Sequence, residues 1–224
     1  MRETPMLADP ERALALVHAP ADKRAALATL WSLDERLGAV VATTREPMIG
    51  AIRLAWWREA LQGKDSEGGP RGEPLLGLIR EALQELDGQG LSKLCDGWAV
   101  LLEALPLDAG QLTSFAAERG DLLWQLAMRI LDDTRAEELA NGGGGWALVD
   151  LAFRVSDRET AERALAMASE RLANVPSRWP RTLRPLGMLV ALARRDIRNG
   201  LDSPRRIGSP ARVGRMLWHR ISGI

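Results

Sequence analysis

Residues 46–61 read EPMIGAIRLAWWREAL, and no other stretch of the chain says more about its fold. Pro47 suits the first turn of a helix, where its missing N–H costs no hydrogen bond. With about 100° between successive residues, two faces of this helix are largely apolar. One face carries Ile49, Ile52, Trp56 and Ala60, and the other carries Gly50, Arg53, Trp57 and Leu61. Because a helix that is apolar all round is normally buried, we expect other helices to surround it.

Arg53, Trp57 and Arg58 are the candidate ligand-binding residues of this helix. Arg53 and Trp57 are four apart, a spacing that allows the guanidinium to stack on the indole. Arg58 points about 140° away from Arg53, so the two cannot form one anion clamp unaided. Two interpretations stay open. Either Trp57 is core and carboxylates hold the arginines, or all three line an apolar cavity that takes a diphosphate or other anion with its lipid tail.

The composition favours helices throughout. Aromatic residues make up only 4% of the 224 residues, tyrosine is absent, and alanine, leucine, arginine and glutamate dominate. Such residues favour helices over strands. We therefore predict an all-α fold, a single-domain helical bundle over residues 1–224, with a flexible loop at 63–73 and a hinge at the four glycines 142–145. The single cysteine, Cys95, excludes internal disulfides and is expected to be a buried thiol.

The stretch at 46–61, with Leu30-Trp31-Ser32-Leu33 before it, resembles a divergent, shorter branch of the squalene/phytoene synthase family, the head-to-head prenyl transferases. Weaker similarity runs through 115–131 and 145–154 to 201–204, so the resemblance covers residues 20–224. It implies a helical bundle of the isoprenoid synthase type. Active members of the family hold Mg²⁺ with aspartates on facing helices, and the metal neutralises the departing pyrophosphate.

The resemblance also places the two aspartate-rich motifs of the family on this chain. The first motif falls on Gly38, Ala39 and Ala42, which carry no carboxylate. In the second, Arg154 is kept, but Val155 stands where an aspartate is expected. We therefore predict degenerate metal motifs, with no catalytic residue, no metal ligand and no cofactor. The alternative is that displaced carboxylates bind Mg²⁺.

Other acidic residues are weak candidates for that displaced site. Two acidic pairs have a four-residue spacing: Glu81 with Glu85, and Asp133 with Glu137. Neither pair lies between large apolar residues, so we interpret both as solvated. Asp34 precedes the first motif position by one turn, and we expect it to form a local ion pair with Arg36 or Arg45.

From these residues we predict a squalene/phytoene synthase-like protein that has lost Mg²⁺-dependent prenyl transfer. The resemblance implies a non-catalytic role in binding an isoprenoid or another lipid, or in assembling a membrane complex, because that branch includes an assembly factor for respiratory complex I. A respiratory-complex protein is then the expected partner. The alternative is an active transferase that condenses isoprenoid diphosphates.

The charge is unevenly distributed, although the formal net charge is zero. From residue 178 onward the chain has eleven arginines and two aspartates, and 199–224 form a basic C-terminal segment. These arginines pair with the acidic remainder of the chain, or they contact anionic lipid headgroups with Trp218 and Ile221 at the interface. The arginines are not interleaved with stacking aromatics, so we expect no nucleic-acid binding. With no leader and no long apolar run, we expect a cytoplasmic protein, peripheral to the inner membrane.

Overall fold

The computed structural model describes residues 4–63, 73–133 and 137–224, and every regular element in these ranges is helical. The α-helices are α1 (Pro10–Val17), α2 (Arg24–Ala42), α3 (Pro47–Leu61), α4 (Pro74–Ala82), α5 (Gly88–Ala99), α6 (Ala109–Phe115), α7 (Leu122–Ile130), α8 (Glu137–Ala152), α9 (Arg158–Ala173), α10 (Arg184–Asn199) and α11 (Pro210–Ser222). Short turns are η1 (Val100–Leu102), η2 (Ala116–Asp121, π-helical) and η3 (Arg181–Leu183). The predicted all-α fold is confirmed. Residues 64–72 of the predicted flexible loop lie outside the described residues. Asp133 is buried, 2% exposed, and accepts from Thr182 Oγ1 at 2.6 Å, so the interpretation of this residue as solvated is wrong.

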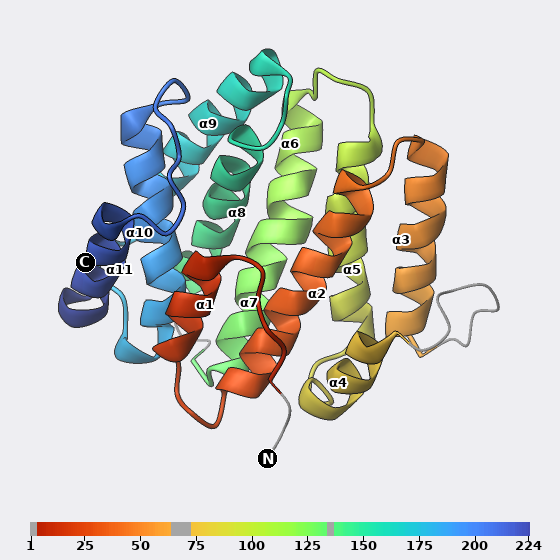
Figure 1. Cartoon of the computed structure of the whole chain (residues 1–224), viewed down its shortest axis with the longest axis horizontal. Helices are drawn as coiled ribbons and strands as arrows, with labels where there is room; N and C mark the ends of the chain where they lie inside the picture. The colour runs from red at the N-terminus through yellow and green to blue at the C-terminus, as the bar shows by residue number, and fades with distance from the viewer. Residues whose placement is uncertain (1–3, 64–72, 134–136) are drawn as a thin grey trace.

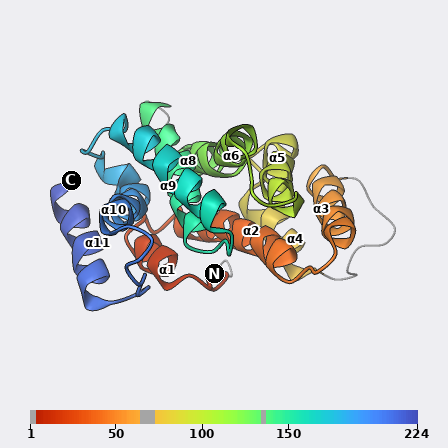
Figure 2. The same cartoon turned by 90° about the horizontal axis from the view of Figure 1, so that it is seen from above.

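The helices form a bundle with α3 at one edge and α11 at the opposite edge (Figure 1, Figure 2). Between these edges, large apolar side chains from α2, α6, α7 and α8 form the core, among them Trp31, Phe115, Trp124 and Trp146. Cys95 of α5 is fully buried among them, and burial raises the pKa of its thiol to about 12. Among the described residues, no helix is both long and apolar enough to cross a bilayer.

Side-chain caps begin several helices where the sequence places acidic residues. Asp9 accepts hydrogen bonds from the first-turn amides of α1, and Asp157 caps α9 in the same way. Asp108 and Gln111 form a reciprocal capping box at the start of α6. A cap of this kind stabilises a helix by about 1 kcal/mol, because it satisfies amides that have no partner within the helix.

α3 is not surrounded by other helices, contrary to the expectation from its two apolar faces. It packs on α5, α2 and η1 through Gly50, Leu54, Trp57 and Leu61. The opposite face is open, with Met48, Ile49 and Ile52 exposed. The pattern of residues gave two equally apolar faces, and only the position of α3 at the edge of the bundle decides which one is buried.

The four glycines at 142–145 do not form a hinge, because α8 runs unbroken through them. They allow close packing on η2 and α9. A Cβ on Gly143 would overlap the carbonyl oxygen of Gly120, and a Cβ on Gly144 would lie 2.6 Å from Asp121 Oδ1. Glycine costs about 1 kcal/mol relative to alanine inside a helix. Here that cost is offset by contact between two backbones that no side chain would allow.

The end of the chain is tied to its beginning by a series of ion pairs. Arg212 of α11 contacts Glu11 of α1 through Nε at 2.6 Å and Nη2 at 2.8 Å, and it also pairs with Asp196 of α10. Arg205, in the loop before α11, lies 3.0 Å from Asp196 through Nε and 3.4 Å from Asp150 of α8 through Nη1. The series therefore joins α1, α11, α10 and α8.

We expect His219 of α11 to make the fold sensitive to acid. Burial, with the charges of Arg215 and Arg184, lowers the pKa of this imidazole to about 4. Since the unfolded chain takes up the proton near pH 6.5, stability is full above that pH and falls as the pH drops towards 4. The expected loss is about 1 kcal/mol per pH unit. Urea unfolding between pH 7 and pH 4 should show this slope in the wild type and a shallower one in His219→Leu. The comparison variant His18→Gln should flatten the slope less, because His18 is only partly buried, although burial and the charges of Arg220 and Arg24 also lower its pKa.

Candidate functional site

A cavity of about 550 Å³ lies between the chain before α1, α2, α5 with η1, η2 and the end of α8. Its lining residues come from helices that lie in the middle of the bundle in Figure 1, among them α2 and α8, and none of the described ones comes from the edge helix α3. The degenerate motif positions meet here: Gly38, Ala39, Ala42, Arg154 and Val155 all line it. Two segments more than a hundred residues apart in the sequence thus contribute to one cavity.

The floor of the cavity contains Asp34, which is fully buried on α2. Its Oδ2 accepts from Arg12 Nη2 at 2.6 Å and from Arg119 Nη2 at 3.2 Å. Its Oδ1 accepts from Trp98 Nε1 at 2.8 Å and from Arg119 Nε at 3.1 Å. The expected pairing of Asp34 with Arg36 or Arg45 is therefore wrong. Arg36 pairs with Glu73 instead, because Asp34 points into the bundle, where α1 and η2 supply the cations.

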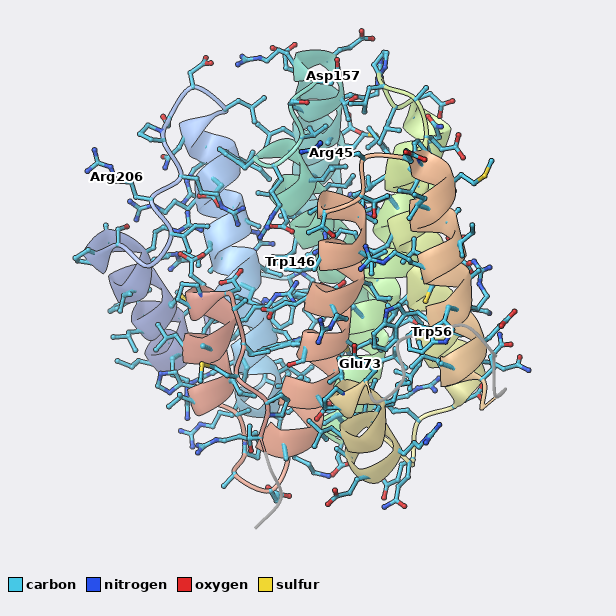
Figure 3. The ribbon with its side chains drawn as sticks, turned by 45° about the vertical axis from the view of Figure 1, so that its right-hand side comes forward. Arg45, Trp56, Glu73, Trp146, Asp157 and Arg206 are labelled. Carbon is cyan, nitrogen blue, oxygen red and sulfur yellow. The ribbon has the colours of Figure 1, made fainter. Side chains whose placement is uncertain are left out.

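A second buried carboxylate, Asp150 of α8, completes the floor. Arg119 Nη2 reaches its Oδ2 at 3.0 Å, and Arg154 Nε reaches its Oδ1 at 2.8 Å. Arg119 thus bridges both aspartates. Its guanidinium also lies 4.0 Å from the ring centre of Trp98 and 5.0 Å from that of Trp146. Figure 3 places Trp146 in the interior of the bundle.

Arg119 occupies the π-helical turn η2, which interrupts the long helical stretch from α6 to α7. A π turn inserts one residue into the helix and changes the direction in which neighbouring side chains point. Such turns are frequent at functional sites. Here the turn carries a guanidinium that is 2% exposed into the centre of the bundle.

Both aspartates are held in the ionised form. Burial alone would raise the pKa of Asp34, but Arg119 and Arg12 outweigh it and lower the pKa below its usual value. Burial would likewise raise the pKa of Asp150, but the charges of Arg119, Arg154 and Arg205 outweigh it and lower the pKa. These carboxylates are therefore negative at neutral pH and matched by the guanidiniums around them.

Position 38 has no room for a carboxylate. A Cβ on Gly38 would lie 2.7 Å from Cη2 and 2.9 Å from Cζ2 of Trp98. Trp98 cannot easily move aside, because it donates to Asp34 and is covered by Arg119. The packing of Trp98 on Gly38 thus occupies the volume that an aspartate side chain would need.

The carboxylates around the cavity do not fit a magnesium site. Asp34 and Asp150 are engaged by guanidiniums, whose charge also opposes a cation. Asp9 caps α1, and Glu35 accepts from the amides of Ala8 and Asp9. Within the described ranges, no group of three His, Cys, Asp or Glu side chains is arranged to hold a metal ion. Since Mg²⁺ requires free carboxylate oxygens, the acids present are unsuited to it.

The charge and shape of the lining favour an uncharged, apolar ligand. The described lining contains three arginines and four carboxylates, so there is no excess of positive charge to attract a diphosphate. Above this floor the walls are apolar, formed mainly by Val41, Leu101, Leu105, Leu107 and Ile207. The volume is within the range of small-molecule sites.

The predicted ligand-binding residues of α3 lie elsewhere. Arg53, Trp57 and Arg58 are not among the described residues that line the cavity. Trp57 is buried against the core, exposed Arg53 has Nη1 3.4 Å from Thr44 Oγ1, and Arg58 pairs with Asp96. Of the four candidate ligand-binding residues, the structure brings only Arg154 to the cavity.

Sequence reasoning missed Arg12 and Arg119 and gave Asp150 no role. One signal was present for each aspartate of the floor: Asp34 shares a helix face with Leu30 and Leu37, and Asp150 lies between Val149 and Leu151. A charge on the core face of a helix calls for a buried partner. The sequence does not indicate which arginine that partner is.

Comparison with known proteins identifies a family. A family model described as squalene/phytoene synthase matches residues 7–152. That range includes α1 to α8 and thus Arg12, Asp34, Arg119 and Asp150. No curated protein matches the chain.

Proposed function

The chain belongs to the squalene/phytoene synthase family, and from that premise we propose that it binds an uncharged isoprenoid-like lipid without performing metal-dependent prenyl transfer. The single observation that carries the proposal is the floor of the cavity, where Arg12, Arg119 and Arg154 engage Asp34 and Asp150. Ionising an allylic diphosphate requires concentrated positive charge on the leaving group. A floor whose charges already neutralise one another does not provide it.

The biological role that we propose is assembly of a membrane complex. Its support is the resemblance of residues 46–61 to the branch of the family that includes an assembly factor for respiratory complex I. An isoprenoid-like lipid would be available to the protein at a membrane, because such lipids are found there. A partner protein from a respiratory complex is part of this proposal.

The proposal is tested by comparing farnesol and farnesyl diphosphate as ligands, with and without Mg²⁺. We expect farnesol to bind and the diphosphate to bind no more tightly, because the cavity offers no net positive charge. We expect no release of pyrophosphate when Mg²⁺ is added. Titration calorimetry measures the binding, and a pyrophosphate assay measures the chemistry.

A substitution that fills the cavity tests whether the ligand binds there. Ala39→Trp, on the wall of the cavity, should weaken farnesol binding by at least about tenfold. Ala51→Trp, on the exposed face of α3, is the matched control and should bind as the wild type does. In cells that lack the chain, Ala51→Trp but not Ala39→Trp should restore assembled complex I. Turnover of the diphosphate that depends on Mg²⁺ would establish the alternative, an active transferase.

A further inference from the structure

The outward face of α11 is apolar, the reverse of what an edge helix normally presents to water. Arg212, Met216 and His219 point into the bundle. With about 100° per residue, the opposite side of the helix carries small or apolar residues. They are Ala211, Gly214, Leu217, Trp218 and Ile221. Trp218 is 57% exposed and Ile221 is 76% exposed, and they lie on the outermost helix at that edge of the bundle (Figure 2).

Arginines flank this face, and α11 contains no acidic residue. Arg215 and Arg220 lie on its two sides. Arg184 Nη1 donates to the carbonyl oxygens of Arg220 at 2.8 Å and Ile221 at 3.0 Å, which brings the start of α10 beside the end of α11. Exposed Arg178 and Arg181 precede Arg184 in the chain. The rim of the apolar face is thus cationic.

Most arginines of this rim have no Asp or Glu partner among the described residues. Arg205 and Arg212 do pair with acidic residues, as one interpretation of the sequence expected. In the part of the chain that the structure describes, Arg178, Arg181, Arg184 and Arg220 form no ion pair, and Arg215 Nη1 donates to the main-chain oxygen of Ile224 at 3.2 Å. Arg206 projects away from the bundle (Figure 3). Burial and the charges of Arg181, Arg220 and Arg178 lower the pKa of Arg184, so the cluster repels itself.

The charge pattern favours an anionic lipid surface over a second copy of the chain as the partner of this face. A second copy of the chain would bring the same arginines against one another in a symmetric contact, and their repulsion would oppose it. An anionic lipid surface offers phosphates to the rim and hydrocarbon to the centre at the same time. Tryptophan suits the boundary between the two, because its ring is apolar and its N–H is polar.

We propose that this face of α11, with Arg178, Arg181, Arg215 and Arg220 around it, docks on a membrane surface that contains anionic phospholipid. Leu217, Trp218 and Ile221 enter the boundary between headgroups and acyl chains. The interaction is independent of the lipid in the cavity, so it extends beyond the proposed function. Ile207, in the loop just before α11, lines the cavity, so the docked helix is joined directly to the cavity wall.

Co-sedimentation with vesicles tests the proposal. The wild type should bind vesicles of phosphatidylcholine with phosphatidylglycerol, bind phosphatidylcholine alone much more weakly, and lose affinity as salt rises. Ile221→Ser and Trp218→Ser should each weaken binding by about tenfold, through lost apolar contact. Arg178→Gln and Arg181→Gln should each weaken it by about fivefold. Arg178 and Arg181 lie outside α11, so their variants still test the proposal if a substitution in α11 impairs folding.

Two controls make the result specific. Ile52→Ser removes an equally prominent side chain, 64% exposed, from the opposite edge and should bind vesicles as the wild type does. Ala39→Trp fills the cavity and should also keep vesicle binding, which separates this proposal from the proposed function. The proposal is overturned if the wild type ignores anionic vesicles, if the α11 variants bind normally, or if those substitutions abolish a dimer instead.

Discussion

Replacing Asp34 with asparagine is expected to lower the free energy of unfolding by about 3–5 kcal/mol. The substitution keeps the shape of the side chain but removes the charge that balances Arg12 and Arg119, which are 4% and 2% exposed. A buried guanidinium without its counter-charge is costly, because water cannot replace the lost partner. Urea unfolding followed by far-UV circular dichroism measures the change.

The matched control is Asp96→Asn, which breaks the pair between Asp96 and Arg58. Both of those side chains are 39% exposed, so solvent already screens their interaction. We expect a loss of at most about 1 kcal/mol. Equal losses in the two variants would mean that the charges on the cavity floor are no more interdependent than those on the surface.

The second large effect is expected from Gly143→Ala, a single added methyl group in α8. Its Cβ would overlap the carbonyl oxygen of Gly120 and lie 2.8 Å from Cγ of Trp124. Neither can yield cheaply, because one is backbone and the other is a fully buried ring. The helices must separate, and we expect a loss of about 3 kcal/mol in the free energy of unfolding.

Gly77→Ala is the control for the gain in helix propensity that accompanies any such change. Gly77 lies inside α4, and a Cβ there would meet nothing within 4 Å. Alanine should therefore stabilise the protein by up to about 1 kcal/mol. Thermal melts of the two variants should move in opposite directions. If both rise, the close approach of α8 to η2 is not a packing constraint.

The sequence was sufficient for the class of fold and for the start of α3 at Pro47, because these depend on local residues. Asp9, Asp108 and Asp157 cap helices where the capping rules put them. The interpretation failed where tertiary packing overrides local preference. The run 142–145 has the composition of a break, yet it is helical, because α8 packs backbone to backbone on η2.

The site was only partly predictable for a related reason. The family pattern located Gly38 and Arg154, which the cavity brings together. The partners of Asp34, however, lie 22 and 85 residues away, at Arg12 and Arg119. A search for ion pairs within one or two helical turns does not reach that far. Pairing across the bundle depends on how α1 and η2 cross α2, which no spacing rule specifies.

The bridge that Arg205 makes between Asp150 and Asp196 sets a lower limit on the size of the folding unit. Residues 7–152 carry the similarity to the family, but that segment alone would leave Asp150 and Glu11 without the guanidiniums of Arg205 and Arg212. Cutting the protein after residue 152 would therefore remove counter-ions from its own interior. Residues 153–224 supply Arg205 to Asp150 on the cavity floor, and any attempt to produce a minimal version should retain them.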